Sequence, residues 1–389
     1  MAISKIKSTS IEDDAITSAK VADGVISAAD VADGTLTNAK LADGTIENAK
    51  LAGSIANDKL ANSSVTINGN SVSLGASASI AAGMFRNIFI NGDMSIAQRG
   101  TTSSSTGYQT VDRWQLVTGT QQEQKTDTPN ARFSNSFEVT GTTAGSSGYG
   151  ICSQRIESKN VLPVLGQTCT LSAYVKNTGT STVNVSVEVY RANSTDNFSG
   201  LTLLTSLTGQ AITTSWNRIT FPSFTVTDAC ATGLEVRIFR YDASNDQEWL
   251  LTGVQLEAGT TASDFEFLPY DVNLQRCQRY YWQQISSDSS TVRPVAVGSY
   301  IQNTYIEWTT QFPVQMRATP SLVSPTVTNG YEIYRAGAAD SFNEVLLGNS
   351  TQYMAFLYNN TQVSGTGGQA GSIYCPNTYA SSIAFSAEL

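Results

Sequence analysis

Residues 21–50 read VADGVISAAD, VADGTLTNAK and LADGTIENAK, which are three consecutive copies of a ten-residue unit. A weaker copy, IEDDAITSAK, precedes them at 11–20, and LAGSIANDK follows at 51–59, one residue short. Each copy carries two large aliphatic residues five positions apart, such as Val31 and Leu36. Because a period of ten matches neither a continuous helix nor a continuous strand, each copy must mix conformations.

The residue order within a copy predicts where the conformation changes. Thr37 can cap a short Ala-rich helical turn over residues 38–43, and Gly44 can close that turn with a left-handed backbone. Gly24 and Gly34 hold the position of Gly44 in the preceding copies. The residues that follow each glycine favour extended structure, so a turn and an extended step alternate along the repeat.

A single chain offers nothing against which these paired aliphatic residues can be buried. Several chains wound around a common axis would bury them, and a homotrimer is the symmetric arrangement with a narrow core. If each copy combines helical and extended segments, it would advance roughly 20 Å along the axis. The five copies would then form a rod about 100 Å long. We therefore expect residues 11–83 to form a trimeric fibrous repeat shaft; a flexible linker rich in Ala, Gly and Ser is the alternative.

The repeat is followed by VTINGNSVSL at residues 65–74, in which apolar and polar residues alternate on both sides of Asn68 and Gly69. This pattern predicts a β-hairpin with a tight turn. Tandem VADGTLTNAKLADG units followed by VTINGNSVSLG resemble the shafts of bacteriophage tail fibres. The resemblance implies that residues 1–10 attach the chain to tail or capsid proteins of the virion, from which the shaft projects.

Composition separates the repeat from the rest of the chain. No Phe, Trp or Tyr precedes Phe85, although aromatic residues make up 9% of the chain. Charged residues are only 14%, about half of what is usual in soluble domains, which argues against a coiled coil and favours β structure with polar, uncharged loops. The length of 389 residues allows two or three domains.

Several functions are disfavoured by residues that the chain lacks. It has no His, which excludes Ser/His/Asp triads and His-ligated metal sites. A net charge of −9 argues against binding to nucleic acid, which needs clustered Lys and Arg. Residues 1–10 do not resemble a signal peptide, and no apolar run approaches the ~20 residues of a membrane helix. We expect the chain to be made in the host cytoplasm and not to insert into a membrane. Its final location is expected to be the tail of the virion.

Between residues 84 and 270, short alternating runs recur at intervals of roughly ten to fifteen residues, separated by turns rich in Gly, Ser, Thr and Asn. The strands expected from these runs lie near residues 89–91, 113–117, 136–139, 169–175, 183–190, 217–221, 234–240 and 249–256. This spacing predicts a jelly-roll β-sandwich. Trp114, Trp216 and Trp249 fall within or beside strands, and we expect them in its core.

This region begins with NIFINGD at residues 87–93 and ends with TGVQLEAG at 252–259. The pair resembles the opening and closing strands of carbohydrate-binding-module-like jelly rolls in phage tail fibres, although Met94 stands where Phe is usual. The resemblance implies that the opening strand returns against the closing strand.

The resemblance also implies a structural calcium ion, because the opening loop of that family often holds one. Asn91, Asp93 and Glu257 are the candidate ligands, and oxygen ligands on a loop suit Ca²⁺. The alternative is that Asp93 only forms a turn and that Glu257 is solvated.

Carbohydrate recognition stacks sugar rings on exposed aromatic side chains and binds their hydroxyl groups with nearby amides and carboxylates. Tyr108, Tyr149 and Tyr241 lie beside predicted turns of the jelly roll. These three tyrosines are therefore the candidate carbohydrate-binding residues.

The sequence changes character at residues 271–283. Leu274, Cys277 and Tyr281 recur at helical spacing behind a potential N-cap at Asp271, which predicts a short linker helix. The run LQRCQRYYW within this segment resembles a recurrent signature of phage fibre proteins.

Residues 284–389 predict a second, smaller β-sandwich. The expected strands lie near residues 295–300, 304–312, 320–323, 331–334, 353–358 and 383–389. FPVQMRATPSL at 312–322 and IAFSAEL at 383–389 resemble the distal tip domains of the same fibres. The expected fold is thus all-β: a trimeric repeat shaft, a jelly-roll sandwich and a C-terminal knob.

The five cysteines are scattered along the chain and show no CxxC spacing. We expect them to be small buried side chains rather than disulfides or metal ligands. They are Cys152, Cys169, Cys230, Cys277 and Cys375.

Together these features predict a virion structural protein, a trimeric tail fibre that recognises host cell-surface polysaccharide without catalysis. A fibre or decoration protein of the capsid is an alternative with the same architecture. A polysaccharide depolymerase is another, since that chemistry needs two carboxylates about 5 to 10 Å apart. The candidate carboxylates are Asp242, Asp246, Glu248, Asp264 and Glu266.

Overall fold

The computed structural model describes residues 9, 11–37, 62–67, 70–76, 86–141, 150–179, 182–241, 248–286, 292–376 and 381–389. The chain divides into two units, residues 1–65 with 71–77 and residues 66–70 with 78–389. In the ranges described, no helix has the length and apolar character needed to cross a membrane.

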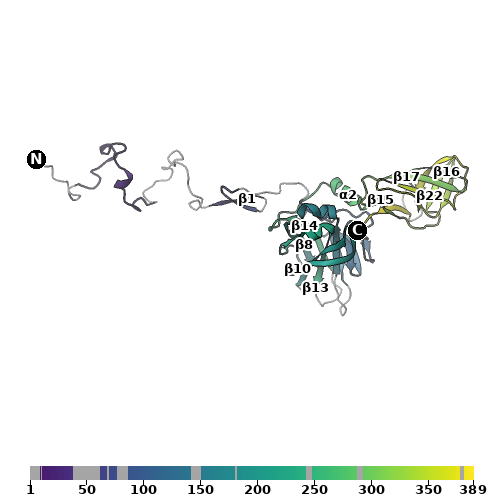
Figure 1. The fold of residues 1–389 in the computed structure, drawn as a ribbon, viewed down its shortest axis with the longest axis horizontal. Coiled ribbons are helices and arrows are strands. Elements are labelled where there is room, and N and C mark those ends of the chain that lie inside the picture. Colours follow the sequence, from purple (N-terminus) through teal and green to yellow (C-terminus); the bar gives the residue numbers. More distant parts are fainter. Residues whose placement is uncertain are drawn as a thin grey trace. The chain divides into compact units, whose positions relative to one another are not determined.

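In the N-terminal unit, the described copies of the repeat share one local structure (Figure 1). The 3-10 helices η2 (Ser18–Lys20) and η3 (Ala28–Asp30) lie ten residues apart. Gly24 and Gly34 follow them with φ angles of 77° and 78°, and Asp14 takes this place in the first copy with φ 61°. The left-handed backbone predicted at Gly24 and Gly34 is therefore confirmed, while Gly44 lies outside the described residues.

The capping of these turns differs from the expectation. Thr17, before η2, has the extended backbone of an N-cap, but its side chain makes no capping hydrogen bond in the described segment. In the next copy, the Asp30 carboxylate accepts hydrogen bonds from Ser27 N at 2.8 Å and Ser27 Oγ at 2.7 Å. The turn predicted over residues 38–43 lies outside the described residues.

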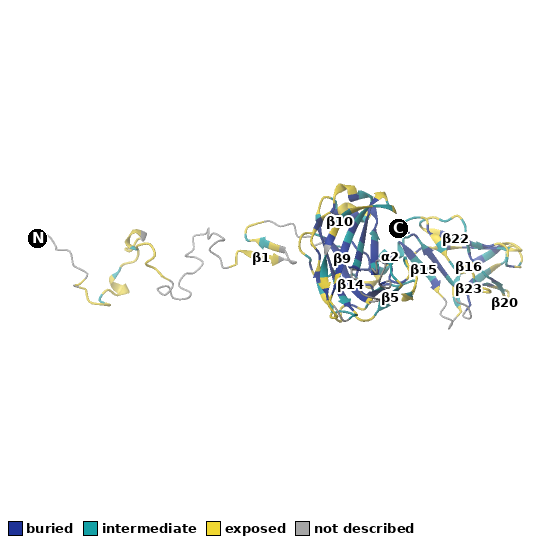
Figure 2. Cartoon of the chain, turned by 90° about the horizontal axis from the view of Figure 1, so that it is seen from below, coloured by how far each residue is buried: buried dark blue, intermediate teal, exposed yellow. Residues whose placement is uncertain are grey.

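At the second aliphatic position of each described copy the side chain is exposed within a single chain, whereas Val21 and Val31 at the first position are half-buried (Figure 2). Ile16, Ile26 and Leu36 are 58%, 60% and 62% exposed. The backbone hydrogen bonds of this segment close local turns, for example from Val25 N to Ala22 O at 3.3 Å. Burial of these side chains therefore requires another surface, and the trimeric shaft stays a prediction.

Strands β1 (Ser64–Ile67) and β2 (Asn70–Ser73) pair with each other. Leu74 N donates to Ser63 O at 2.9 Å beside them. The predicted β-hairpin is thus confirmed, while its turn at residues 68–69 lies outside the described part.

Two antiparallel sheets form the β-sandwich that follows (Figure 1). The five-stranded sheet has the order β10 (Asn197–Ile212), β9 (Val183–Ser194), β13 (Leu234–Tyr241), β7 (Gly150–Ile156) and β4 (Gln115–Thr118). The other sheet has the order β11 (Asn217–Thr220), β8 (Thr168–Asn177), β14 (Glu248–Ala258), β6 (Ser136–Thr140), β5 (Gln121–Lys125) and β3 (Thr102–Ser103), with β12 (Phe224–Thr225) paired to β8. Short helices α1 (Ser158–Val161), η7 (Leu162–Val164) and η8 (Asp228–Thr232) lie between strands.

The core of the sandwich lies between these two sheets. Since successive side chains of a strand point to opposite faces, alternate residues enter the core. In β9, Val185, Val187 and Val189 are fully buried, and they share one core with Leu251 of the facing sheet. The all-β sandwich expected from the sequence is confirmed.

The opening segment of the sandwich pairs with the closing strand β14, as the resemblance implied. Ile88 N donates to Leu256 O at 2.9 Å, and Leu256 N donates to Asn87 Oδ1 at 3.1 Å. The strand expected at residues 89–91 does not form, because the backbone of Asn91 turns with φ 57°.

The tryptophans of the sandwich divide between core and surface. Trp114 and Trp249 are fully buried, as predicted. Trp216 is only half-buried, and its Nε1 donates to Asp127 Oδ1 at 2.8 Å. The prediction of a core position for Trp216 was wrong, because this residue precedes the edge strand β11 rather than lying inside a sheet.

All five cysteines are buried and free, which confirms the expectation. Burial raises the pKa of the Cys169 thiol to about 11. Such thiols stay protonated at neutral pH and act as small apolar side chains.

The helix after the sandwich, α2 (Tyr270–Gln278), is shorter than the one expected over residues 271–283. Pro269 occupies its N-cap, and Asp271 lies in its first turn instead of capping it. The chain enters strand β15 at Tyr281 because that residue pairs with a C-terminal strand.

The C-terminal domain is a second antiparallel β structure with a core of its own. Its three-stranded sheet has the order β15 (Tyr281–Ser286), β24 (Ser382–Ser386) and β18 (Ser321–Val323). Its seven-stranded sheet has the order β20 (Ala338–Phe342), β19 (Tyr331–Arg335), β23 (Ala370–Cys375), β16 (Arg293–Gln302), β17 (Tyr305–Gln311), β22 (Met354–Asn359) and β21 (Leu346–Leu347). Trp282 stacks on Phe385 in this core, with ring centres 5.7 Å apart.

Arginines join the end of the C-terminal domain to the sandwich. The Glu388 carboxylate pairs with Arg99 at 3.1 Å and with Arg113. Arg317 donates to the Glu388 carbonyl at 2.9 Å, and the Arg113 guanidinium lies 3.6 Å from the centre of the Tyr280 ring. We call these residues, Arg99, Arg113, Tyr280, Arg317 and Glu388, the Glu388 cluster.

Candidate functional site

The outer face of the five-stranded sheet is defined by the alternation of β13. Leu234, Val236 and Ile238 enter the core. Glu235 and Arg237, which stand between them, therefore lie on the opposite face.

Strand register extends this face into two rows. Both rows consist of residues directly opposite one another in β9, β13 and β7: Tyr190, Glu235 and Arg155 in the first, and Glu188, Arg237 and Ser153 in the second. At the edge strand β4, Gln115 continues the second row, and its Nε2 donates to Ser153 Oγ at 2.9 Å. The rows bring together residues that are distant in the chain, such as Arg155 and Glu235, which are 80 positions apart.

Two arginines hold one buried carboxylate at the centre of the face. Arg155 Nε lies 2.9 Å from Glu235 Oε2, and Arg237 Nε lies 2.6 Å from Glu235 Oε1. The Glu235 side chain is 0% exposed, whereas each arginine side chain is 25% exposed. A guanidinium carries five N–H donors, so each arginine keeps further donors after pairing with Glu235. One of those of Arg155 is used within the chain, since its Nη1 donates to the Leu389 carbonyl at 2.5 Å.

Tyr190 adds an aromatic ring to the same network. Its hydroxyl donates to Glu188 Oε2 at 2.6 Å, and the Arg237 guanidinium lies 4.6 Å from the centre of its ring. Burial, together with the hydrogen bond to Glu188, raises the pKa of Tyr190. The phenol therefore stays protonated at neutral pH, with one edge half-buried and the ring held in place by Arg237.

We call Arg155, Glu188, Tyr190, Glu235 and Arg237 the sheet-face network. Its two arginines and two glutamates balance in charge. A neutral ligand rich in hydroxyl groups fits this arrangement, because fixed donors and acceptors alternate beside an aromatic ring. A nucleic-acid backbone would instead need an excess of positive charge.

Sequence reasoning missed all five residues of the sheet-face network. The signal was present in LEVRIFR at 234–240, whose alternation places Glu235 and Arg237 on one face. The sequence does not reveal, however, that β9 and β7 flank β13, and this adjacency brings Tyr190 and Arg155 to the same place.

None of the tyrosines predicted to bind sugar is among the five residues that define this network. Tyr108 is half-buried, with its ring 5.9 Å and 5.7 Å from the Arg99 and Arg113 guanidinium groups. Tyr149 and the side chain of Tyr241 lie outside the described residues. The three tyrosines stay predictions, and Tyr108 packs beside the Glu388 cluster.

The structure brings two of the three predicted calcium ligands to a shared partner. Asn273 donates to Asp93 Oδ1 at 3.0 Å and accepts from Asn91 N at 3.2 Å. Glu257 is bonded elsewhere, because its carboxylate accepts a hydrogen bond from Ser263 Oγ at 2.6 Å. Its side chain is 5% exposed, so the alternative prediction that Glu257 is solvated was wrong. In the described ranges, no group of three or more His, Cys, Asp or Glu side chains could hold a metal ion. The calcium site stays a prediction.

Close packing constrains the opening loop that contains Asp93. A Cβ on Gly92 would lie 2.2 Å from the Val254 carbonyl oxygen, so only glycine fits against the closing strand. Burial raises the pKa of Asp93, while hydrogen bonds from Ser95 and Asn273 oppose that shift. Sequence reasoning missed Asn273, whose signal was a polar residue on the buried side of helix α2.

The carboxylates considered for depolymerase chemistry lie in different surroundings. Asp264 is 96% exposed, whereas Glu266 accepts a hydrogen bond from Asn87 N at 2.9 Å. Glu248 is exposed at the start of β14, and Asp242 and Asp246 lie outside the described residues.

No protein-family model matches this sequence, and no curated protein matches it either. Among solved structures, the enzymatically active domain of tailspike protein 4 of bacteriophage CBA120 aligns with 45% of this chain at 15% identity and a TM-score of 0.30. The CBM22-1 xylan-binding domain of Paenibacillus barcinonensis Xyn10C aligns with 43% of this chain and 97% of its own, at 15% identity and a TM-score of 0.29. The family 11 carbohydrate-binding module of the Clostridium thermocellum cellulase Lic26A-Cel5E aligns with 45% of this chain and 96% of its own, at 11% identity and a TM-score of 0.27.

The tailspike alignment spans 22% of that protein's chain. The structural neighbours thus include a phage tailspike domain and carbohydrate-binding modules. Similarities of this size assign no function to the present chain.

Proposed function

We propose that this chain is a phage tail-fibre protein that binds host cell-surface polysaccharide through the outer face of the five-stranded sheet. The sheet-face network carries the proposal, because it combines charge-balanced donors and acceptors with an aromatic ring on a sheet face where both arginine side chains are 25% exposed. The N-terminal repeat supports the assembly part, since its aliphatic side chains need other copies of the chain for burial.

In this proposal, the arginines of the network bind the sugar hydroxyls. Arg155 and Arg237 are already fixed by Glu235, so binding costs little of their side-chain freedom. Tyr190 offers its ring to the apolar face of a sugar. Each contact is weak, and a trimer that presents three such faces would strengthen attachment through multivalency.

The proposed activity is binding without cleavage. Asp264 is open to solvent rather than enclosed in a cleft, and Glu266 accepts a hydrogen bond from the Asn87 backbone. Release of new reducing ends from a bound polysaccharide would instead favour the depolymerase alternative.

The binding proposal is tested with the full-length protein on immobilised bacterial capsular polysaccharides and lipopolysaccharides. We expect the wild type to bind at least one of them, and Arg237→Ala and Tyr190→Ala to weaken that binding at least tenfold. Arg218→Ala is the matched control, because Arg218 is also 25% exposed but lies on the other sheet. Wild-type binding that survives both variants, or no binding to any glycan, would contradict the proposal.

The place of the fibre on the particle is a separate question. We propose attachment to the tail through residues 1–10, with a capsid fibre as the alternative. Electron cryomicroscopy of particles carrying this protein distinguishes the two, since the density for the sandwich would extend from the tail in one case and from the capsid in the other.

A further inference from the structure

Glu388 and Leu389 of the C-terminal domain contact the strand that carries Arg155 of the sheet-face network. Arg155 lies near the end of β7, and its Nη1 donates to the Leu389 carbonyl at 2.5 Å. Arg113 Nη2 donates to the backbone carbonyl of Arg155 at 2.6 Å, and Arg113 also pairs with the Glu388 carboxylate. Two consecutive residues of the C-terminal domain thus hold the side chain of Arg155 directly and its backbone through Arg113.

The residue two positions after Arg155 is held as well. The Glu157 carboxylate accepts hydrogen bonds from Arg279 Nη2 at 2.8 Å and from the Tyr280 hydroxyl at 2.9 Å. The Glu157 side chain is 5% exposed, and charge-assisted hydrogen bonds of this kind are the strong ones. Arg279 follows Glu157 by 122 positions. The end of β7 is therefore fixed by residues that come much later in the chain.

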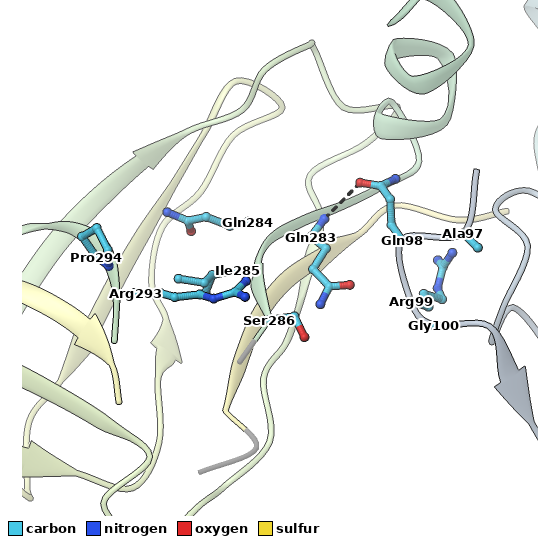
Figure 3. A pocket seen from close by; sticks show the side chains of 10 residues that line it. All are labelled: Ala97, Gln98, Arg99, Gly100, Gln283, Gln284, Ile285, Ser286, Arg293 and Pro294. Atoms are coloured by element: carbon cyan, nitrogen blue, oxygen red, sulfur yellow. Dashed lines mark hydrogen bonds between the residues drawn. The ribbon is translucent and has the colours of Figure 1, made fainter. Parts of the chain in front are cut away.

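The junction around these contacts combines hydrogen bonds with apolar packing. Gln283 N donates to Gln98 Oε1 at 3.4 Å beside an open pocket between the sandwich and the C-terminal domain (Figure 3). Gln98 Nε2 donates to the Tyr281 carbonyl at 2.8 Å. The Leu389 side chain packs against a buried cluster made by both domains, which consists of Ile90, Ile96, Cys277 and Tyr280. The position of Leu389 thus depends on how the C-terminal domain docks.

The two arginines of the sheet-face network differ in what holds them. Arg237 is bonded to Glu235 and lies beside the Tyr190 ring, and both partners belong to the sandwich. Arg155 is bonded to Glu235 through Nε and to Leu389 through Nη1. A long side chain that is already held in one orientation loses less conformational entropy when a ligand binds. The C-terminal domain thus fixes one of the two arginines.

We propose that Leu389 and Glu388 are positioning residues for the sheet-face network. Without their contacts, the Arg155 side chain is held at Nε but no longer at Nη1, and a ligand must order it on binding. Because the coupling between two sites is reciprocal, a polysaccharide bound at the network also stabilises the docking of the C-terminal domain. The positioning of Arg155 rests on the contacts listed above, whereas its effect on polysaccharide rests on the proposed function.

The first test uses no polysaccharide. It measures how fast phenylglyoxal, which modifies accessible guanidinium groups, reacts with each arginine of the full-length protein, as followed by peptide mass spectrometry. Leu389→Asp places a carboxylate in the apolar cluster, which is costly and displaces the residue. We expect Arg155 to react severalfold faster in this variant than in the wild type.

Two other arginines are internal controls for this reaction. Arg218 and Arg237 have side chains that are 25% exposed, as Arg155 does, and they should react at the wild-type rate. Glu388→Ala should have the same effect on Arg155 as Leu389→Asp. An unchanged rate at Arg155 in both variants, or an equal rise at all three arginines, would overturn the inference.

The second test measures binding to the immobilised capsular polysaccharides and lipopolysaccharides. Glu388→Ala should weaken binding about three- to tenfold, which is the cost of ordering one long side chain. Glu388→Gln keeps an oxygen acceptor for Arg113 and should retain more of the affinity. Glu332→Ala is the matched control, because it removes a half-buried carboxylate from β19 of the same domain, and it should bind as the wild type does. Wild-type affinity in Glu388→Ala would overturn the positioning role.

Hydrogen exchange distinguishes positioning from a purely structural role. Two backbone amides report on the junction: Ala387 N donates to Tyr280 O at 2.7 Å, and Arg317 N donates to Arg279 O at 2.8 Å. Bound polysaccharide should slow the exchange of both amides by a factor similar to that by which Glu388→Ala weakens binding. If Glu388 only stabilised the fold, both amides would exchange equally fast with and without polysaccharide, which would also overturn the positioning role.

These outcomes separate the positioning role from the proposed function. If the variants speed the reaction of Arg155 and the wild type binds no polysaccharide, only the proposed function fails. If the wild type binds polysaccharide and the variants change neither the reactivity of Arg155 nor the affinity, only the positioning role fails.

Discussion

Ile26 in the repeat is 60% exposed, whereas Ile238 in strand β13 is fully buried. Both belong to regular patterns, with a period of ten in the repeat and of two in the strand. In the sandwich, a second sheet of the same chain covers the apolar face. In the described copies of the repeat, the chain supplies no such cover. An aliphatic pattern thus specifies a face to be buried, but it does not say whether the covering layer belongs to the same chain.

The largest effect is expected from substitutions of the aliphatic residues of the repeat. Replacing both Ile26 and Leu36 by Asp should convert a trimer into monomers, because charges from several chains would meet at the proposed common axis. Light scattering measures the mass in solution. Thr35→Asp, at an exposed position beside Leu36, is the control and should leave the assembly intact. A monomeric wild type would refute the trimeric shaft.

The next largest effect concerns the sandwich alone. Leu251→Ala should lower the free energy of unfolding of the sandwich by about 2–5 kcal/mol, because this side chain is fully buried between the sheets. Chemical denaturation followed by tryptophan fluorescence reports this transition, since Trp114 and Trp249 lie in the same core. Ile26→Ala should leave it unchanged. An equal loss from both substitutions would show that repeat and sandwich unfold as one unit.

A smaller effect tests the turns of the repeat. Gly34→Val should cost about 1–2 kcal/mol per chain, because a side chain disfavours the left-handed backbone at φ 78°. No described atom lies within 4 Å of the added Cβ, so the cost comes from the backbone alone. Asp14→Gly, at φ 61°, should act in the opposite direction. Thermal melting of the repeat followed by circular dichroism measures both, and a Gly34→Val variant that melts later would contradict the turn.

The smallest effect depends on pH and concerns the sandwich's opening loop. Because burial raises the pKa of Asp93 above its usual 3.8, the folded state holds this proton more tightly than the unfolded state does. The resulting contribution to the stability of the folded state is fully present below pH 3.8 and is lost as the pH rises through the raised pKa of Asp93. Asp93→Asn should therefore gain stability relative to the wild type at neutral pH, and this gain should vanish in acid.

Thermal melting between pH 3 and pH 7 checks the expectation for Asp93. Asn can still accept the hydrogen bond from Asn273, so the packing of the loop is kept. The opposite result would be that the variant is less stable at neutral pH and that the wild type melts at a lower temperature when a chelator is added. These two outcomes together would support calcium binding at Asp93.

Strands with alternating apolar residues could be predicted from the sequence, and strands stabilised mainly by their neighbours could not. The run at 183–190 became β9, with Val185, Val187 and Val189 in the core. The long strand β10 was missed, because its Gly, Ser and Thr residues are typical of loops. Antiparallel pairing with β9 along its length keeps it extended. Strand propensity is overridden by such tertiary context.

The candidate site was less predictable than the fold for the same reason. The alternation in β13 indicates which of its residues share a face, so Glu235 and Arg237 could have been grouped from the sequence. Their contacts with Arg155 and Tyr190 follow from the order of strands in the sheet, which local patterns do not contain. The turn tyrosines were chosen by exposure, and Tyr108 shows that a residue beside a turn can still pack against arginines.

The Glu388 cluster imposes an order on folding during synthesis. Arg113 and Arg99 precede Glu388 by 275 and 289 residues. Ribosomes add about 5–20 residues per second, so both arginines leave the ribosome tens of seconds before their carboxylate partner. The sandwich can assemble its sheets in that interval, but its opening segment is completed only when the last strand has arrived. A chain truncated before residue 388 would leave Arg113, which is 1% exposed, as a buried charge without this carboxylate.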